Sequence, residues 1–244
     1  MNEPTPLGFA HFIAQSDMVS KTLLVVLVLM SVVSWTLIIS KGISQMIRRH
    51  RSERFLKMFW EASSLEAVQH EIAHTGIKDP FSRLTAHAMQ AQVHYARYGT
   101  SKLAEAGSNR DFLTRTIKKV LDEETVRQED GLTILATVGS TSPFVGLFGT
   151  VWGVYHALVA IGLSGSGSLD KVAGPVGEAL IMTGLGLAVA LPAVMGYNWL
   201  TRTNRVLSAK LDAFAFELFA FLSSGQTLRG QPRPGNGNGT QDVR

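Results

Sequence analysis

The chain has 244 residues, of which 45% are hydrophobic and only 17% are charged, below the roughly 25% usual in soluble globular domains. Cysteine is absent, which excludes structural disulfides and thiolate metal sites. The net charge of +4 could suit nucleic acid, but no basic–aromatic motif supports such a partner, and the placement of the basic residues favours a membrane protein.

The first long apolar stretch is 22–40, TLLVVLVLMSVVSWTLIIS, which carries no charged residue. About 20 apolar residues allow a helix to cross the hydrocarbon core of a bilayer. The stretch therefore predicts a first transmembrane helix, preceded by an N-terminal arm of residues 1–21.

Residues 41–130 predict a helical domain without strands. Gly76 and Pro80 separate a first helical region from a second, and apolar side chains recur at helical spacing on the third. We expect the third helix to run directly into the next apolar stretch. The expected helical regions are 41–75, 81–98 and 111–128.

Two further apolar stretches, 131–163 and 172–200, each exceed the length that a transmembrane helix needs. The turn-forming residues of 164–171, SGSGSLDK, predict a short loop between them, so the two helices should be antiparallel neighbours. After them, 201–224 predicts an amphipathic helix. The glycine-rich tail 225–244 lacks the apolar content to order itself.

The distribution of lysine and arginine predicts the orientation of the chain. Of the 23 such residues, fifteen lie in 41–130 and six follow residue 200, whereas the N-terminal arm and the 164–171 loop hold one each. By the positive-inside rule, the N-terminus lies outside, and residues 41–130 and the tail lie in the cytoplasm. The cluster RRHR at 48–51 also favours contact with anionic phospholipid.

Residues 70–74, HEIAH, match the zinc-protease pattern H-E-x-x-H, in which His70 and His74 would bind zinc and Glu71 would act as general base. Catalytic zinc needs a third protein ligand, and none stands out downstream. The flanking residues are polar, and the motif lies outside the apolar stretches. We therefore expect two surface histidines on a cytoplasmic helix, and neither a metal, a cofactor nor an enzymatic activity.

Three polar side chains stand out in the second and third apolar stretches. Thr150 lies near the middle of the second, and Thr183 near the middle of the third, so antiparallel packing places them at a similar depth. Glu178 precedes Thr183 by five residues, about 7.5 Å along a helix, and should lie nearer the outer face. His156, on the second stretch, is expected at the outer interface.

Two interpretations of these residues stay open from the residues alone. In one, Thr150, Glu178 and Thr183 face a common polar path, because an ionisable residue within a span is costly and by default marks an ion or proton pathway. A three-span chain is too thin to enclose such a path, so this interpretation requires an oligomer. In the other, the threonines bond their own helices, Glu178 lies at the interface, and the protein is a structural membrane scaffold.

Glycines in the second apolar stretch favour close packing of its helix against a neighbour under either interpretation, because small residues let two helix backbones approach. These glycines are Gly139, Gly146, Gly149 and Gly153.

The segments 141–153, TSPFVGLFGTVWG, and 177–198, GEALIMTGLGLAVALPAVMGYN, resemble the MotA/TolQ/ExbB proton-channel family. Three spans, an outside N-terminus and a large cytoplasmic segment are similar to its three-span branches and unlike its four-span flagellar-stator branch. By this resemblance, Thr150 and Thr183 correspond to the family's pore-facing threonines and Glu178 to its span glutamate.

The resemblance implies a homopentameric ring of mostly helical subunits in the inner membrane of a Gram-negative bacterium, with a periplasmic N-terminus. The pore would hold the single span of an ExbD- or TolR-like partner, whose aspartate takes and releases the proton. Proton flow would drive a TonB- or TolA-like protein that acts across the periplasm. We expect the role in TonB-dependent transport, such as iron–siderophore uptake, with the Tol-Pal envelope-integrity system as the alternative.

Overall fold

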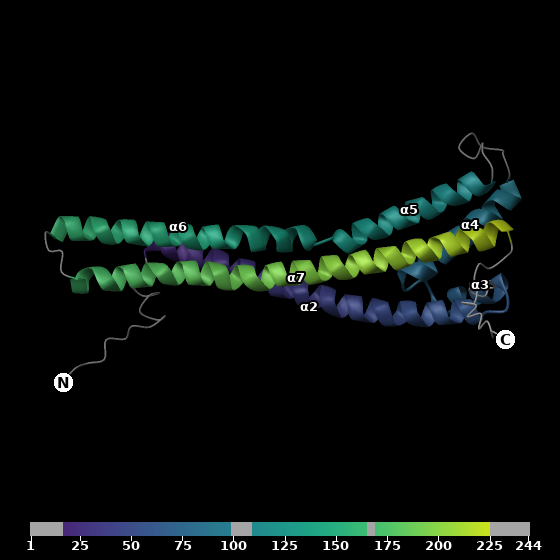
Figure 1. Ribbon diagram of the computed structural model, residues 1–244, viewed down its shortest axis with the longest axis horizontal. Helices are drawn as coiled ribbons and strands as arrows, with labels where there is room; N and C mark the ends of the chain where they lie inside the picture. Colours follow the sequence, from purple (N-terminus) through teal and green to yellow (C-terminus); the bar gives the residue numbers. More distant parts are fainter. Residues whose placement is uncertain (1–16, 99–108, 165–168, 225–244) are drawn as a thin grey trace, which may run out of the picture. The chain divides into compact units, whose positions relative to one another are not determined.

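The computed structural model describes residues 17–98, 109–164 and 169–224. Every regular element in these residues is an α-helix, and no strand occurs among them, as the sequence predicts. Much of the predicted N-terminal arm, the middle of the outer loop and the C-terminal tail lie outside the described residues. The helices in chain order are α2 (Met18–Glu61), α3 (Leu65–Thr75), α4 (Pro80–Tyr98), α5 (Asn109–Glu129), α6 (Leu132–Ser164) and α7 (Leu169–Ser224) (Figure 1).

The chain divides into two compact units. Unit 1 combines Met1–Met46 with Glu129–Asn204, and unit 2 combines Ile47–Gln128 with Arg205–Arg244. Unit 1 contains the three apolar stretches of the sequence, and unit 2 contains most of the predicted cytoplasmic helices. The membrane-related chemistry of the chain is therefore to be sought in unit 1.

Three helical segments of the described residues are long and apolar enough to cross a membrane. This confirms the predicted all-α protein with three apolar spans. The three segments are Met18–Glu61, Arg110–Leu163 and Ala179–Ser223.

Two of the apolar helices continue well beyond the predicted ends of their spans. Helix α2 continues to Glu61, although the apolar stretch that nucleates it ends at residue 40. Helix α7 runs without a break from Leu169 to Ser224, so the predicted span 172–200 and the predicted amphipathic helix 201–224 are one element. No glycine or proline follows residue 196 within this helix, and nothing in the local sequence ends it.

The prediction that the third cytoplasmic helix continues directly into the second span is wrong, because a short turn separates the two helices. Helix α5 ends at Glu129, and α6 begins at Leu132. Between them Gly131 adopts a φ of +74°, a left-handed conformation that glycine reaches without a Cβ clash. Two residues, Asp130 and Gly131, therefore separate α5 from α6, and the conformation of Gly131 breaks the helix between them.

The expected helical region 41–75 is also interrupted. Helix α2 ends at Glu61, and α3 starts after Ser64. Ser64 has an extended backbone, and its side-chain oxygen caps α3 by accepting a 3.2 Å hydrogen bond from the backbone N–H of Ala67. The predicted boundaries at the other end hold, because Gly76 follows α3 with a φ of +78° and Pro80 opens α4.

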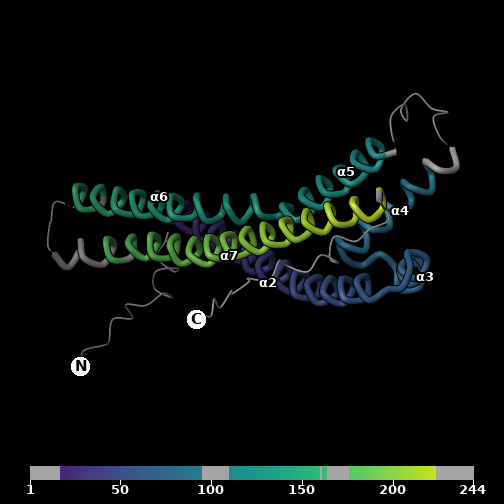
Figure 2. The backbone as a smooth tube through the Cα atoms, turned by 45° about the vertical axis from the view of Figure 1, so that its right-hand side comes forward, coloured from purple at the N-terminus to yellow at the C-terminus, as the bar shows by residue number. Residues whose placement is uncertain are grey.

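Helix α2 packs on α7 within unit 1. A Cβ placed on Gly196 of α7 would lie 2.5 Å from Cγ1 of Ile38, so the absence of a side chain lets α2 approach closely. Leu27 of α2 is 1% exposed and joins a buried cluster with Val138 of α6 and Met182 of α7. Figure 2 shows α6 and α7 side by side, with the start of α2 partly visible behind them.

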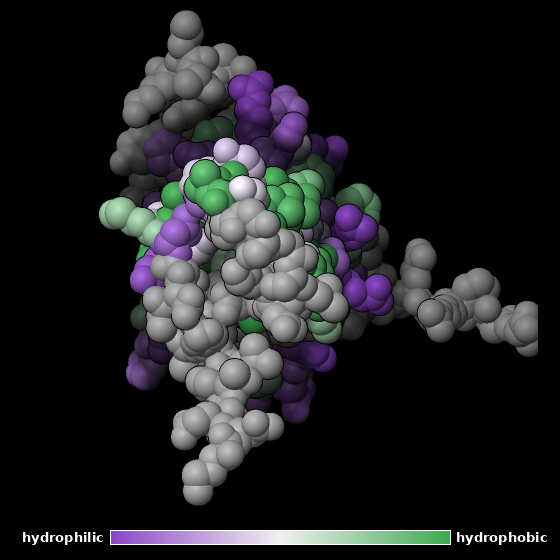
Figure 3. All heavy atoms as spheres, turned by 90° about the vertical axis from the view of Figure 1, so that its left-hand side faces the viewer, coloured by the Kyte–Doolittle hydropathy of each residue, from purple (hydrophilic) through white to green (hydrophobic). Residues whose placement is uncertain are grey.

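Large apolar side chains lie on the outward faces of the unit 1 helices. Phe144 on α6 is 70% exposed, Leu191 on α7 is 63% exposed, and Leu29 on α2 is 58% exposed. Figure 3, which faces the end where α6 finishes and α7 begins, shows apolar side chains at the surface there. Such surfaces require a covering of lipid or of other protein.

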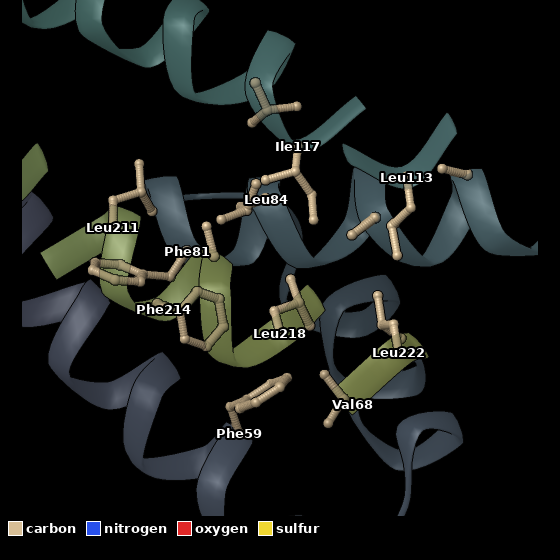
Figure 4. Close-up of a cluster of buried hydrophobic side chains, with 14 of the residues drawn as sticks. Phe59, Val68, Phe81, Leu84, Leu113, Ile117, Leu211, Phe214, Leu218 and Leu222 are labelled. Atoms are coloured by element: carbon tan, nitrogen blue, oxygen red, sulfur yellow. The ribbon is translucent and has the colours of Figure 1, made fainter. Parts of the chain in front are cut away.

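Unit 2 has a separate aromatic and aliphatic core. Phe214 of α7 lies at its centre, with ring centroids 5.1 Å from Phe59 of α2 and 5.4 Å from Phe81 of α4 in edge-to-face arrangements (Figure 4). Leu84 and Leu218 are fully buried beside these rings. The core therefore joins the inner faces of α2, α4 and α7, which their apolar periodicity predicts.

Candidate functional site

The backbones of α6 and α7 approach each other closely at Gly146 and Gly186. A Cβ placed on Gly146 would lie 2.6 Å from the carbonyl oxygen of Met182 and 3.0 Å from Cα of Gly186. A Cβ placed on Gly186 would lie 2.6 Å from the carbonyl oxygen of Ser142. Because real Cβ atoms do not approach backbone this closely, only glycine fits at these two positions.

The other three glycines singled out on α6 also lie against α7. A Cβ on Gly139 would meet Cγ2 of Val194 at 2.6 Å, and a Cβ on Gly153 would meet Cβ of Ala179 at 2.9 Å. A Cβ on Gly149 would lie 2.9 Å from Cε of Met182. One face of α6 is therefore held against α7 over about four turns.

Thr150 and Thr183 meet between these two helices. Their Oγ1 atoms are 2.5 Å apart, and Oγ1 of Thr150 also lies 3.0 Å from the carbonyl oxygen of Ala179 and 3.2 Å from that of Gly146. A hydroxyl has one proton to donate, so when Thr150 donates to one of the carbonyls it accepts from Thr183. The structure thus brings together two of the three polar residues selected from the sequence, both partly buried.

Glu178 lies in helix α7, directly before the Ala179 whose carbonyl faces Thr150. Its side chain lies outside the described residues. Its predicted place beside the threonine pair therefore stays a prediction.

Further hydroxyls follow the exposed face of α6 toward its start. Thr141 donates to the carbonyl of Thr137 at 2.7 Å, Ser140 donates to the same carbonyl at 3.1 Å, and Thr137 donates to the carbonyl of Thr133 at 2.8 Å. These residues were not predicted from the sequence. Their spacing of three and four along an apolar helix is the signal that could have found them.

A contact between the start of α2 and the C-terminal half of α6 was not predicted from the sequence. Oδ2 of Asp17 accepts a 2.6 Å hydrogen bond from Nε1 of Trp152. Oδ1 of Asp17 accepts a 2.8 Å hydrogen bond from the backbone N–H of Ser20, so Asp17 caps the start of α2. The ring of His156 lies 4.6 Å from that of Trp152, and its Nδ1 lies 3.1 Å from the Trp152 carbonyl. The carboxylate therefore joins the beginning of α2 to α6.

This environment sets the protonation of Asp17. Partial burial acts to raise the pKa of its carboxyl group, but the hydrogen bonds from Ser20 and Trp152 and the charge of His156 outweigh burial and hold that pKa below its ordinary value. Asp17 thus stays charged at neutral pH and keeps both hydrogen bonds.

The HEIAH segment forms part of α3. His70 and His74 are exposed, and Oε1 of Glu71 accepts a 2.7 Å hydrogen bond from Thr75. No group of three or more His, Asp or Glu side chains that could hold a metal ion occurs among the residues that the structure describes.

The model of the MotA/TolQ/ExbB proton channel family matches residues 76–213, which include the whole contact between α6 and α7. The chain belongs to the MotA/TolQ/ExbB proton channel family. This confirms the resemblance carried by the 141–153 and 177–198 segments. Members of this family are proton channels rather than enzymes, and together with three apolar helices the family indicates a multi-pass protein of the inner membrane.

Relatives from both three-span branches of the MotA/TolQ/ExbB family are similar to the chain over most of its length. Biopolymer transport protein ExbB of Xanthomonas campestris pv. campestris is 38% identical over 231 residues, which cover 91% of each chain. ExbB of Neisseria meningitidis is 39% identical over 194 residues, covering 80% of this chain and 87% of the relative. Tol-Pal system protein TolQ of Pseudomonas aeruginosa is 30% identical over 210 residues, covering 86% of this chain and 90% of the relative.

Proposed function

We propose that this chain is the proton-channel subunit of an inner-membrane complex that uses the proton-motive force to energise TonB-dependent transport across the outer membrane. The contact between the hydroxyls of Thr150 and Thr183, in a chain that belongs to a proton-channel family, carries this proposal. We prefer the TonB-dependent role because two relatives named ExbB are 38% and 39% identical to the chain, against 30% for the relative named TolQ; a third relative named ExbB is 29% identical.

The threonine pair has the properties of a proton-relay site. Two backbone carbonyls lie within hydrogen-bond distance of Thr150 Oγ1, so when its hydroxyl donates to either of them, its lone pairs accept from Thr183. Thr183 can donate to Thr150 and keeps lone pairs that accept from a water molecule or from a carboxyl group. In our proposal Thr183 therefore faces the proton path, Thr150 orients it, and Glu178 tunes the outer mouth of the path.

The remaining walls of the path come from other chains. Two helices cannot enclose water, and the outward faces of α6 and α7 are apolar and exposed in the single chain. We propose a homopentameric ring around the acidic single span of an ExbD-like partner, coupled to a TonB-like protein. The driving energy is about 2.3 kcal/mol for each charge that crosses 100 mV.

Substitutions that remove the hydroxyl while keeping the shape test this proposal. The single variant Thr183→Val and the double variant Thr150→Val/Thr183→Val should both abolish proton flux in vesicles that hold the complex. Both should also abolish energised iron–siderophore uptake. The matched control is Thr36→Val, because Thr36 is an exposed hydroxyl of α2 that bonds only the Val32 carbonyl of its own helix, at 2.7 Å. Wild-type flux in the assembled double variant would refute the relay and would favour a structural scaffold.

Complementation separates the two branches of the family. The chain, produced in a host that lacks both endogenous systems, should restore iron–siderophore uptake when supplied with its single-span partner. Restoration of outer-membrane integrity alone, measured as resistance to detergent, would instead assign the chain to a Tol-Pal system.

A further inference from the structure

Unit 2 contains a cavity of about 360 Å³ between α2, α3 and the start of α4. Its apolar side includes Phe55 and Ile72, which are 8% and 9% exposed. Its polar side carries three cationic side chains, Arg51 and Arg54 from α2 and Lys78 from the turn between α3 and α4. The cavity thus combines a basic rim with an apolar floor, and nothing in the proposed proton path uses it.

The two carboxylates that border this cavity are already engaged. Oδ1 of Asp79 accepts from the backbone N–H groups of Phe81 and Ser82, at 2.9 and 3.1 Å, and thereby caps α4. Oε1 of Glu71 accepts from Thr75 at 2.7 Å. Both acids therefore satisfy hydrogen-bond donors of their own helices.

The three cationic side chains, unlike the two carboxylates, are not engaged by any residue that the structure describes. Arg51, Arg54 and Lys78 are exposed and form no ion pair within the described part of the chain. By contrast, Arg49 on another side of α2 pairs with Glu53 at 3.0 Å. The positive charge at the cavity is thus available to an anion from outside the chain.

We propose that this cavity binds the phosphate group of a phosphate ester. Guanidinium groups form bidentate, charge-assisted hydrogen bonds with phosphate oxygens, and a lysine adds a further positive charge. The volume is within the range of small-molecule sites, and the apolar floor suits the organic part of an ester. The ligand would join α2 to the α3–α4 turn and would stabilise unit 2.

The phosphate group can come from a lipid headgroup or from a soluble ester. Arg51 follows the predicted end of the first span, residue 40, by eleven residues, about 16 Å along α2, so a lipid headgroup is one of the two sources to test. A soluble cytoplasmic ester reaches the same groups from water. The two sources share one set of contacts and need separate experimental arms.

The test uses the full chain and needs no proton flux, so its outcome is independent of the proposed channel function. In detergent, glycerol 3-phosphate and inorganic phosphate are titrated at constant ionic strength, and the thermal midpoint is measured. In nanodiscs of phosphatidylcholine and phosphatidylglycerol, the lipid retained by the released protein is measured by native mass spectrometry. Arg51→Gln with Arg54→Gln, and separately Lys78→Gln, remove charge at the cavity.

The control Arg115→Gln with Lys118→Gln removes the same charge from the exposed face of α5. A soluble ester is assigned if glycerol 3-phosphate or inorganic phosphate raises the thermal midpoint and the cavity variants need about tenfold or more of the ion for the same rise. The control variant should need the same concentration as wild type. Selective loss of retained phosphatidylglycerol in the cavity variants assigns a lipid headgroup. Absence of binding in both arms, or equal binding by the cavity variants and the control, would overturn the proposal.

Discussion

At the scale of single residues, the geometry separates glycines that cannot be replaced from glycines that can. Gly146 and Gly186 lie where any side chain would overlap backbone of the other helix. Gly184, on the same helix as Gly186, has open space around its missing Cβ. The effect of an added methyl group therefore depends on the helix face and not on the residue type.

Gly146→Ala should destabilise the protein by roughly 1–3 kcal/mol, because the carbonyl of Met182 must move to admit the methyl group. Gly184→Ala is the matched control and should be neutral or stabilising, because alanine favours the helix by about 1 kcal/mol over glycine. Thermal unfolding in detergent measures both. Equal midpoints for the two variants would show that the two backbones are not in contact.

Asp17 gives a second prediction at this scale. A carboxyl group whose pKa is lowered on folding contributes stability above its ordinary pKa of about 4 and loses that contribution as the pH falls through the lower folded value. Asp17→Asn should therefore lower the thermal midpoint at pH 7, and the difference from wild type should begin to shrink below about pH 4 and vanish once the pH is below the lowered pKa of the folded state. Asp122→Asn, at an exposed position of α5, serves as control and should leave the thermal midpoint unchanged both at pH 7 and in acid. A difference for Asp17→Asn that persists unchanged in acid would contradict the role of its charge.

At the scale of the helices, one residue determines where α5 stops and α6 starts. Gly131 combines a φ of +74° with a neighbouring Leu37, whose Cδ2 would lie 3.2 Å from an added Cβ. Both features penalise any side chain. Gly76 after α3 has a similar φ but only the flexible end of Lys78 near its missing Cβ, at 3.9 Å.

Gly131→Ala should therefore cost more than Gly76→Ala, by an amount on the order of 1 kcal/mol, because both variants carry the left-handed strain and only the first adds a contact with α2. Chemical unfolding of the two variants, followed by helical circular dichroism, measures the difference. A larger loss for Gly76→Ala would mean that packing against Leu37 is unimportant.

At the scale of the whole molecule, the sequence predicts what depends on composition and fails where distant segments must meet. Uninterrupted apolar stretches of sufficient length predict the three spans, and a short loop predicts that Thr150 and Thr183 approach each other. The Asp17–Trp152 hydrogen bond joins residues 135 positions apart, and no local pattern marks it. The change from apolar to amphipathic composition near residue 200 predicts a boundary, but α7 continues through it, because a change in composition does not by itself end a helix.

The exposure of unit 1 also leads to a prediction about assembly. Phe144 is 70% exposed in the single chain, whereas Leu135 on the same helix is fully buried. If other chains cover α6 in a ring, Phe144→Ala should weaken the oligomer with little loss of single-chain stability, whereas Leu135→Ala should cost about 2–5 kcal/mol within the chain. Subunit counting and thermal unfolding separate the two effects. An unchanged oligomer in Phe144→Ala would place that face of α6 against lipid.

The contact between Gly146 and Gly186 restricts how this protein can change over evolutionary time. The residues at most buried contacts can change in sequence, because a larger side chain on one element can be accommodated by a smaller side chain on the opposite element. Here neither position has a side chain to give up, so no second substitution at the partner position can restore the fit. Lineages that keep this helix pair must keep both glycines, and variation is confined to the faces that turn away from it.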